Sequence, residues 1–282
     1  MKLLDGKLVA KKIRTKIKTE VKALNTKPGI AVILVGDNPA SQIYVNKKKQ
    51  VAQRLGFKSN NYCLHSSTTK EELYSLIETL NQDDSIHGIL LQLPLPKHLN
   101  PKDYFHLIHP NKDIDGFHPN NVGNLHLEID ALYPCTPEGV IALLKFYDIT
   151  IKGQNIAMIG RSNLVGKPLA QMLSNHEGSV SILHHKTKNL KDFTKNADII
   201  ITACGDPKFF NSSYLGRPST LIDVGITKLP SGEICGDMDF EDMIKSPLCK
   251  AITPVPGGIG PLTIASLMSN TLKAYKLSKN LL

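Results

Sequence analysis

A tyrosine and a lysine one helical turn apart are the first residues of this sequence whose types could do chemistry together. They are Tyr44 and Lys48, in the segment 41–57, which reads SQIYVNKKKQVAQRLGF. A lysine that points into a partly desolvated pocket has a lowered pKa and can serve as a base. A lysine in a run of charges is, however, commonly solvated, with its stem lying along apolar surface.

The helical period of segment 41–57 leaves both alternatives open. At roughly 100° per residue, one side of a helix collects the apolar residues and the other collects the polar ones. Lys48 falls in the middle of the apolar arc, whereas Lys47 lies near its edge and Lys49 outside it. The arc consists of Ile43, Tyr44, Val45, Val51, Ala52 and Leu55.

A second candidate site is a strand followed by a glycine-containing loop and a helix. The strand-like run 154–160 leads into GRSNLVGKPLAQML, in which Gly160 permits a tight turn and Gly166 permits close packing. The N–H groups of such a helix start can bind a pyrophosphate. The spacing departs from G-x-G-x-x-G, so a plain strand–turn–helix remains the alternative.

The end of the next strand indicates which dinucleotide would bind. NAD-specific domains carry an acidic residue there, which binds the ribose 2′-hydroxyl. This sequence has no carboxylate at that point and reads His184, His185, Lys186 and Thr187. These residues, with Arg161 as a second cation, favour the 2′-phosphate of NADP. The alternative is a polar strand end that faces water.

Three loops are dense in proline and glycine, and they are typical of ligand walls. They span residues 92–96, 112–119 and 252–263, and the second contains Asp113 and Asp115. Prolines make rigid turns, while glycines let the backbone approach a ligand closely.

The elements that must position these residues alternate between strand-like and helical patterns, which predicts an α/β fold with mostly parallel sheets. An irregular stretch, 109–136, separates two α/β halves, and the helix 137–147 crosses this junction. The helix 261–277 is expected to return to the first half. The strand-like runs span residues 29–36, 87–94, 154–160, 178–184, 197–205 and 219–225.

The composition indicates an ordinary globular protein and restricts its function. Of the 282 residues, 41% are hydrophobic and 21% charged, and no apolar run is long enough for a transmembrane helix. The five cysteines are widely spaced without C-x-x-C, which argues against disulfides and zinc and favours the cytoplasm. The net charge of +9 suits an anionic partner, but no nucleic-acid-binding motif accompanies it. We therefore expect no metal, no nucleic acid and no membrane.

Eight motifs together resemble the bifunctional methylenetetrahydrofolate dehydrogenase/methenyltetrahydrofolate cyclohydrolase family, over nearly the whole chain. They are VGDNPASQIYVNKKK, GILLQLPLP, KDIDGFHP, PCTPEGV, GRSNLVGKP, IDVGI, GDMDF and TPVPGGIGPLT. The resemblance implies that Lys48, Tyr44 and Gln92 are catalytic, with Lys48 as the base. It places Asp113 outside the site. The implied substrate-binding residues are Tyr44, Lys48, Gln92, Leu93, Asp115, Pro256, Gly257 and Gly258.

The resemblance also implies the cofactor-binding residues. These are Gly160, Arg161, Ser162, His185, Lys186 and Ile226. Many family members have serine where this chain has His185, so the contact with the cofactor phosphate is expected to differ while its basic character is kept.

Two α/β domains with an active-site cleft between them are the fold that the resemblance implies. The folate-binding catalytic domain is expected at 1–136, completed by the helix 261–282. A Rossmann-like, doubly wound NADP-binding domain is expected at 137–260. The protein is expected to be a homodimer that acts on tetrahydrofolate one-carbon derivatives with polyglutamyl tails, in the cytoplasm.

The implied chemistry comprises an oxidation and a hydrolysis. NADP⁺ would oxidise 5,10-methylenetetrahydrofolate to the 5,10-methenyl cation, and water would convert this cation to 10-formyltetrahydrofolate. Three alternatives are a basic nucleic-acid-binding protein, a dehydrogenase without the hydrolytic step, and a shikimate- or amino-acid-type dehydrogenase. The first is disfavoured because the sequence has no nucleic-acid-binding motif. The second is disfavoured because Lys48 and Gln92 are both present, and the third because of the motifs in the first half of the chain.

Overall fold

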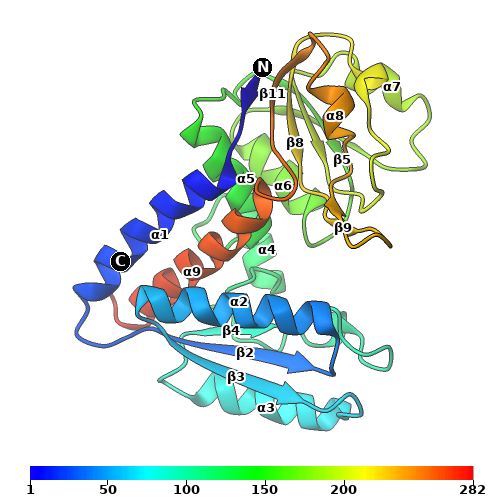
Figure 1. The fold of residues 1–282 in the computed structure, drawn as a ribbon. Helices are drawn as coiled ribbons and strands as arrows, with labels where there is room; N and C mark the ends of the chain where they lie inside the picture. Colours follow the sequence, from blue (N-terminus) through cyan, green and yellow to red (C-terminus); the bar gives the residue numbers. More distant parts are fainter. Residues whose placement is uncertain (282) are drawn as a thin grey trace. The chain divides into compact units, whose positions relative to one another are not determined.

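A computed structural model describes residues 1–281 as two compact units (Figure 1). The six-strand unit comprises Met1–Lys11 and Thr136–Thr263. The three-strand unit comprises Lys12–Cys135 and the residues from Ile264 onward. The boundaries between them fall inside or at the start of three helices: α1 (Gly6–Lys22), α5 (Cys135–Phe146) and α9 (Ile259–Ser278).

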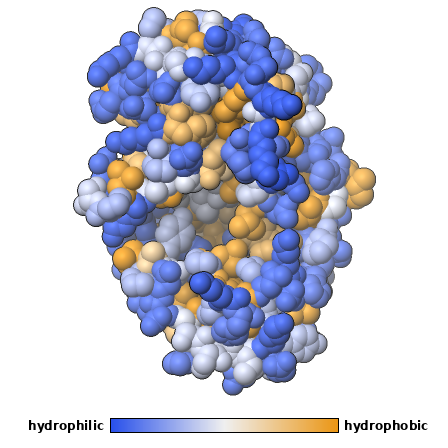
Figure 2. Space-filling view, turned by 90° about the vertical axis from the view of Figure 1, so that its right-hand side faces the viewer, coloured by the Kyte–Doolittle hydropathy of each residue, from blue (hydrophilic) through white to orange (hydrophobic). Residues whose placement is uncertain are grey.

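Hydrophilic residues cover most of the face drawn in Figure 2, and hydrophobic ones are dispersed among them. None of the helices within residues 1–281 combines the length and apolar character that a membrane span requires.

The six-strand unit is built on a parallel sheet, which confirms the predicted α/β class. Its strand order is β1-β11-β8-β7-β5-β6, and every neighbouring pair is parallel. The strands are β1 (Lys2–Leu3), β5 (Asn155–Ile159), β6 (Ser179–Leu183), β7 (Ile199–Thr202), β8 (Ser219–Asp223) and β11 (Cys249–Ile252).

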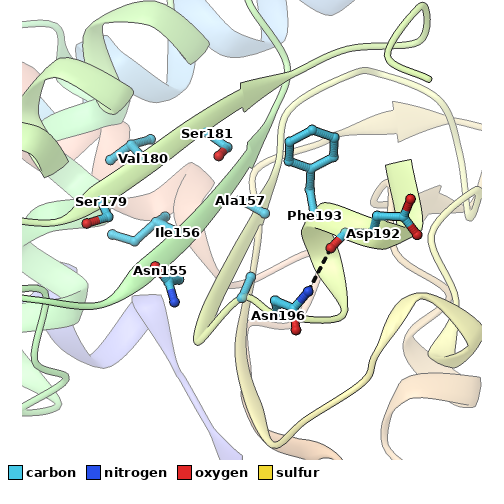
Figure 3. Close-up of a pocket in the computed structure, with 10 residues that line it drawn as sticks. Asn155, Ile156, Ala157, Ser179, Val180, Ser181, Asp192, Phe193 and Asn196 are labelled. Atoms are coloured by element: carbon cyan, nitrogen blue, oxygen red, sulfur yellow. Dashed lines mark hydrogen bonds between the residues drawn. The ribbon is translucent and has the colours of Figure 1, made fainter. Parts of the chain in front are cut away.

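Helices and a small hairpin complete the six-strand unit. The strands β9 (Thr227–Lys228) and β10 (Ile234–Cys235) pair antiparallel. The helical segments are α6 (Gly166–Asn175), α7 (Leu190–Thr194), η2 (Ser212–Tyr214) and α8 (Phe240–Met243). A groove on the sheet is lined by residues of β5, β6 and the α7 region (Figure 3).

The three-strand unit has a parallel sheet of order β3-β2-β4. Its strands are β2 (Gly29–Val35), β3 (Lys58–Leu64) and β4 (Gly88–Leu91), and its further helices are α2 (Pro39–Leu55), α3 (Lys70–Gln82), η1 (Pro101–Asp103) and α4 (Pro119–His126). The helix α4 lies inside the stretch that the sequence analysis describes as irregular. The strand β3 has no strand-like apolar run, because it is a polar edge strand with several exposed side chains.

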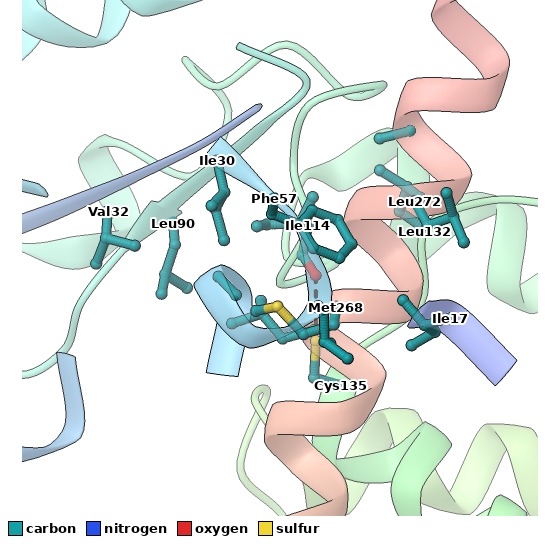
Figure 4. Close-up of a cluster of buried hydrophobic side chains, with 14 of the residues drawn as sticks. Ile17, Ile30, Val32, Phe57, Leu90, Ile114, Leu132, Cys135, Met268 and Leu272 are labelled. Atoms are coloured by element: carbon teal, nitrogen blue, oxygen red, sulfur yellow. Dashed lines mark hydrogen bonds between the residues drawn. The ribbon is translucent and has the colours of Figure 1, made fainter. Parts of the chain in front are cut away.

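The central strand β2 explains why both faces of this sheet are covered. All seven of its residues are buried, as expected for a parallel strand between two layers. Its alternate side chains enter two separate cores, one with α3 and one with α2 and α9. Figure 1 shows α2 and α3 on opposite faces of the sheet. Figure 4 shows Met268 and Leu272 of α9 near Ile114 and Phe57 in the second core.

Candidate active site

The helix α2 carries the Tyr44–Lys48 pair, and local signals at both its ends define it. The Asn38 side chain accepts hydrogen bonds from the N–H groups of Ala40 (3.0 Å) and Ser41 (3.2 Å), and a proline occupies the first position. Gly56 ends the helix with a φ of 94°, which glycine adopts readily.

Lys48 is buried, with only 6% of its surface exposed. Lys47 is exposed and Lys49 is half-buried. The structure thereby decides between the two alternatives that the helical period leaves open, since the Lys48 side chain does not extend into water. The predicted apolar arc was wrong at Ile43, which is 69% exposed and lies outside the packed face of α2.

The ammonium of Lys48 contacts two of the residues that the sequence analysis associates with it. Its Nζ donates a hydrogen bond to Gln92 Oε1 at 3.0 Å and lies 5.0 Å from the centre of the Tyr44 ring. Gln92 follows β4, where its N–H donates to Ile33 O at 2.8 Å. Its Nε2 donates to Leu93 O at 2.6 Å, so the amide is oriented with its oxygen toward the lysine.

Asp115 lies close enough to interact electrostatically with Lys48 and Tyr44. Burial raises the pKa of the Asp115 carboxyl, and the positive charge of Lys48 opposes that rise. Burial lowers the pKa of Lys48, while the negative charge of Asp115 opposes the change. Burial also raises the pKa of Tyr44. The net effect is to make the neutral amine of Lys48 more accessible near neutral pH than that of a solvated lysine.

A second lysine of the same unit shows what a fully bonded lysine looks like. Lys112 Nζ donates to three carbonyl oxygens at the end of α3, those of Leu80 (3.1 Å), Asn81 (2.8 Å) and Asp83 (2.9 Å). The Lys48 amine has one hydrogen bond within residues 1–281, to Gln92. Lys48 therefore retains donor or acceptor capacity for a ligand, whereas Lys112 caps a helix.

Asp113 holds the loop that presents Asp115. It is 3% exposed, and its Oδ2 accepts hydrogen bonds from His118 N (2.7 Å) and Asn121 Nδ2 (3.0 Å). Gly116 then turns the chain with a φ of 74°, so close to the backbone of Tyr133 that a Cβ would lie 2.5 Å from its carbonyl carbon. Asp113 is thus placed to support the loop.

In the six-strand unit, the loop after β5 has the glycine geometry that the sequence predicts. A Cβ at Gly160 would lie 2.5 Å from Ala203 O, and one at Gly166 would lie 2.1 Å from Gly160 O. Ser162 Oγ accepts hydrogen bonds from Val165 N (3.1 Å) and Gly166 N (3.4 Å), which prepares the start of α6. The Arg161 side chain is exposed.

The other predicted cofactor residues follow neighbouring strands. His185 and Lys186 are exposed in the turn after β6, and Ile226 follows β8 with 56% of its surface exposed. Because the strands are parallel, the loops after β5, β6, β8 and β11 all lie at one edge of the sheet, where open α/β sheets bind ligands.

The loop after β11 contains Pro256, Gly257 and Gly258. Pro256 is exposed, while both glycines are buried. Gly258 packs so closely on α1 that a Cβ at Gly6 would lie 1.7 Å from Gly258 O. Only a residue without a side chain fits at Gly6, so the loop after β11 lies directly against the backbone of α1.

Two family descriptions match the chain, one for each part. Residues 4–115 match the catalytic domain of tetrahydrofolate dehydrogenase/cyclohydrolase, and residues 134–279 match its NAD(P)-binding domain. The chain belongs to the tetrahydrofolate dehydrogenase/cyclohydrolase family. It is a bifunctional dehydrogenase and cyclohydrolase of folate one-carbon metabolism. Membership rules out the shikimate- or amino-acid-type alternative.

Relatives of the tetrahydrofolate dehydrogenase/cyclohydrolase family match the chain from end to end. The bifunctional protein FolD of Campylobacter concisus is 47% identical over 285 residues, covering 99% of this chain and 100% of the relative. A crystal structure of the FolD enzyme from Campylobacter jejuni has a TM-score of 0.95 and 47% identity, with both chains fully covered. The Trypanosoma brucei enzyme, solved with NADP cofactor and inhibitor, has a TM-score of 0.92 and 33% identity over 98% of this chain and 97% of its own.

Sequence reasoning missed one residue that supports the loop of Asp115. Asn270 of α9 is 2% exposed, and its Nδ2 donates to Ile114 O (3.0 Å) and Tyr133 O (2.8 Å). It thereby ties the backbone next to Asp115 to the backbone before Cys135. The sequence carried no clear signal for this role, because the partners of Asn270 lie more than 130 residues away in sequence.

Proposed function

We propose that this enzyme oxidises 5,10-methylenetetrahydrofolate with NADP⁺ and hydrolyses the resulting 5,10-methenyl cation to 10-formyltetrahydrofolate. The observation that carries the proposal is the buried Lys48 amine, bonded to Gln92 and placed beside Tyr44. The resemblance to the family implies that both steps take place at one site. Residues 1–136 with the helix 261–282 would bind folate, and residues 137–260 would bind the dinucleotide.

For the hydrolytic step, we assign Lys48 as the general base. A neutral amine can take a proton from water as the water oxygen attacks the cationic bridge carbon, and burial favours that neutral form. The bond from this carbon to N5 then breaks, and N5 takes up a proton. A bound cationic substrate further disfavours the ammonium. Gln92 Oε1 holds the amine in one direction, which keeps the lone pair aimed at the water.

For the oxidative step, the chain supplies orientation. Asp115 would accept two N–H bonds from the amide and amino edge of the pterin, and Tyr44 would stack on the folate. Leu93, Pro256, Gly257 and Gly258 would form further contacts with the substrate. Positioning of the bridge carbon accounts for much of the rate of a hydride transfer.

NADP⁺ would supply the hydride acceptor. Gly160 and Gly166 bring the loop after β5 close to the start of α6, whose N–H groups would bind the pyrophosphate, and Ser162 and Ile226 stand at the same edge of the sheet. The exposed Arg161, His185 and Lys186 suit a 2′-phosphate, since no carboxylate ends β6.

The test is an absorbance assay that follows NADPH formation and methenyltetrahydrofolate decay separately. Purified enzyme with methylenetetrahydrofolate should reduce NADP⁺ much faster than NAD⁺ and should then consume the methenyl intermediate. Comparable kcat/KM values for NADP⁺ and NAD⁺ would contradict the assignment of the cofactor. Accumulation of the methenyl compound without decay would contradict the hydrolytic step.

The active unit that we propose is a homodimer in the cytoplasm. The outer edge of β6 supports it, because Ile182 is 47% exposed there and Phe193 of α7 is 45% exposed beside the groove of Figure 3. An edge strand with apolar neighbours can pair with a second copy. Sedimentation should give a dimer that Ile182→Lys with Phe193→Lys converts to a folded monomer, while Leu127→Lys has no effect. A wild-type monomer at every concentration would refute the proposal.

The net positive charge suits substrates with polyglutamyl tails. Lower KM values for polyglutamylated than for monoglutamylated folate, with a difference that shrinks in high salt, would support this assignment.

A further inference from the structure

Two aspartates are buried at the carboxyl edge of the six-strand sheet, and the catalytic scheme above does not use them. Asp223 ends β8 and is 3% exposed, and Asp237 follows β10 and is fully buried at 0%. Their partners in the structure are N–H groups and one threonine hydroxyl, with no cation among residues 1–281.

Asp223 joins three segments through its two oxygens. Its Oδ1 accepts hydrogen bonds from Gly225 N (3.0 Å), Asp237 N (3.1 Å) and Thr202 Oγ1 (3.2 Å). Its Oδ2 accepts one from Met238 N at 2.8 Å. The end of β7, the loop after β8 and the segment after β10 are therefore all bonded to one carboxylate.

Asp237 extends these connections to the loop after β7. Its Oδ2 accepts a hydrogen bond from Cys204 N at 2.6 Å, and its Oδ1 accepts one from Asp206 N at 3.0 Å. Asp223 in turn binds the N–H of Asp237 itself. The two side chains form one continuous network across the ends of two adjacent parallel strands.

Two glycines make this network possible. A Cβ at Gly236 would lie 1.9 Å from Asp223 Oδ2, and a Cβ at Gly225 would lie 2.2 Å from Asp237 Oδ1. The Asp223 carboxylate thus fills the space that a side chain at Gly236 would need. The Asp237 carboxylate likewise fills the space that a side chain at Gly225 would need. The two loops and the two carboxylates fit together only in this arrangement.

Burial of two carboxylates without a cation costs free energy that an apolar pair would not. Burial raises the pKa of Asp223 to about 6 and also raises the pKa of Asp237, which shows that the charged forms are disfavoured. A carboxylate is nevertheless the side chain that accepts several N–H bonds at once, so it can fix loops in one conformation.

We propose that Asp223 and Asp237 are positioning residues for the nicotinamide cofactor. By binding Gly225 N, Asp223 sets the place of the adjacent Ile226, and by binding the N–H groups of Cys204 and Asp206, Asp237 sets the loop after β7 at the same edge. This inference rests on the proposed function, because it takes Ile226 and this edge as the cofactor site.

The test uses Asp223→Asn and Asp237→Asn in the full-length enzyme, with both activities measured well below each variant's melting temperature. An amide turns an NH₂ donor toward N–H groups that need an acceptor, so the loops should shift. The KM for NADP⁺ should rise by about tenfold. The cyclohydrolase kcat/KM should stay within about threefold, because hydrolysis consumes no cofactor.

Asp198→Asn is the matched control. Asp198 lies at the opposite end of β7, where its Oδ2 accepts a hydrogen bond from Asn155 N (2.9 Å) and its Oδ1 pairs with Arg217 (3.1 Å). Its substitution removes a carboxylate from the same sheet and should lower the melting temperature without changing the KM for NADP⁺.

An unchanged KM for NADP⁺ in the folded Asn variants, or a parallel loss of both activities, would overturn the inference. If the Asn variants fail to fold, Thr202→Val removes one donor from Asp223 and should still raise the KM for NADP⁺ by about twofold; an unchanged KM in this variant would equally overturn it. A wild-type enzyme without NADP⁺-dependent oxidation would instead contradict the proposed function.

Discussion

The two candidate sites use charge in opposite ways. In the three-strand unit, the central group is a buried amine, Lys48, whose neighbours are an amide and an aromatic ring. At the edge of the six-strand sheet, the cations Arg161 and Lys186 are exposed, while the buried charges are carboxylates that bind loop N–H groups.

The difference follows from what each group has to do. A base must lose its proton near neutral pH, and burial lowers the pKa of a lysine toward that range. A phosphate-binding cation must stay charged, which solvation favours. The comparison teaches that burial distinguishes the residue that we assign as the base, whereas exposure does not argue against a role in binding an anion.

The largest expected effect tests the role of the buried Lys48 amine. Lys48→Met keeps the stem and removes the amine, so the cyclohydrolase rate should fall by about 10³-fold. Hydride transfer depends mainly on positioning, so part of the dehydrogenase activity should remain and methenyltetrahydrofolate should accumulate. Lys47→Met and Lys49→Met are the controls and should leave both rates within about twofold, as for surface charges. Hydrolysis by Lys48→Met at the wild-type rate would show that another group is the base.

The next largest effect distinguishes the roles of Asp115 and Asp113, two carboxylates of one loop. Asp115→Ala should raise the KM for folate by roughly a hundredfold in both assays, because a two-bond, charged contact is lost. Asp113→Ala leaves the N–H groups of His118 and Asn121 without their buried acceptor. It should lower the free energy of unfolding by about 2 kcal/mol. Urea unfolding and steady-state kinetics together test this, and equal KM values for the two variants would mean that both residues act through the loop.

A smaller effect is expected for the exposed cations. Arg161→Met should reduce kcat/KM for NADP⁺ by about tenfold, because a charged hydrogen bond to the 2′-phosphate is lost. The value for NAD⁺, which lacks this phosphate, serves as the internal control and should change little. An equal loss with both cofactors would assign Arg161 to the shared pyrophosphate instead.

The smallest effect is a shift in pH dependence that only the buried amine should show. If Lys48 is the base, the cyclohydrolase needs its neutral form, so the rate should rise with pH as the ammonium loses its proton. Gln92→Glu places a carboxylate next to the ammonium, which raises the pKa of Lys48, so the rising part of the profile should move to higher pH. The pH profile of hydride transfer should move less. A cyclohydrolase profile that stays in place would argue against Lys48 as the titrating group.

Particular residues show how far sequence reasoning reached. The period of segment 41–57 placed Lys48 on the apolar side of a helix, and the structure has this helix at Pro39–Leu55. The same period misplaced Ile43, because a repeat angle cannot tell which edge of an apolar arc a neighbouring element covers. The polar strand β3 was missed because an edge strand with exposed side chains carries little hydrophobic pattern.

The sequence by itself determined the α/β class, the buried strand β2, the glycine positions of the loop after β5, and a basic end to β6 with no carboxylate. These are local properties of side-chain type and spacing, and short-range sterics and burial act on them directly. Only the tertiary structure decided that Lys48 is buried and bonded to Gln92, that Asn270 holds the loop of Asp115, and that Asp223 binds the segment of Asp237 while Asp237 binds the loop after β7. Each of these contacts joins residues that are distant in sequence, and burial and hydrogen bonding become known only when packing brings such residues together.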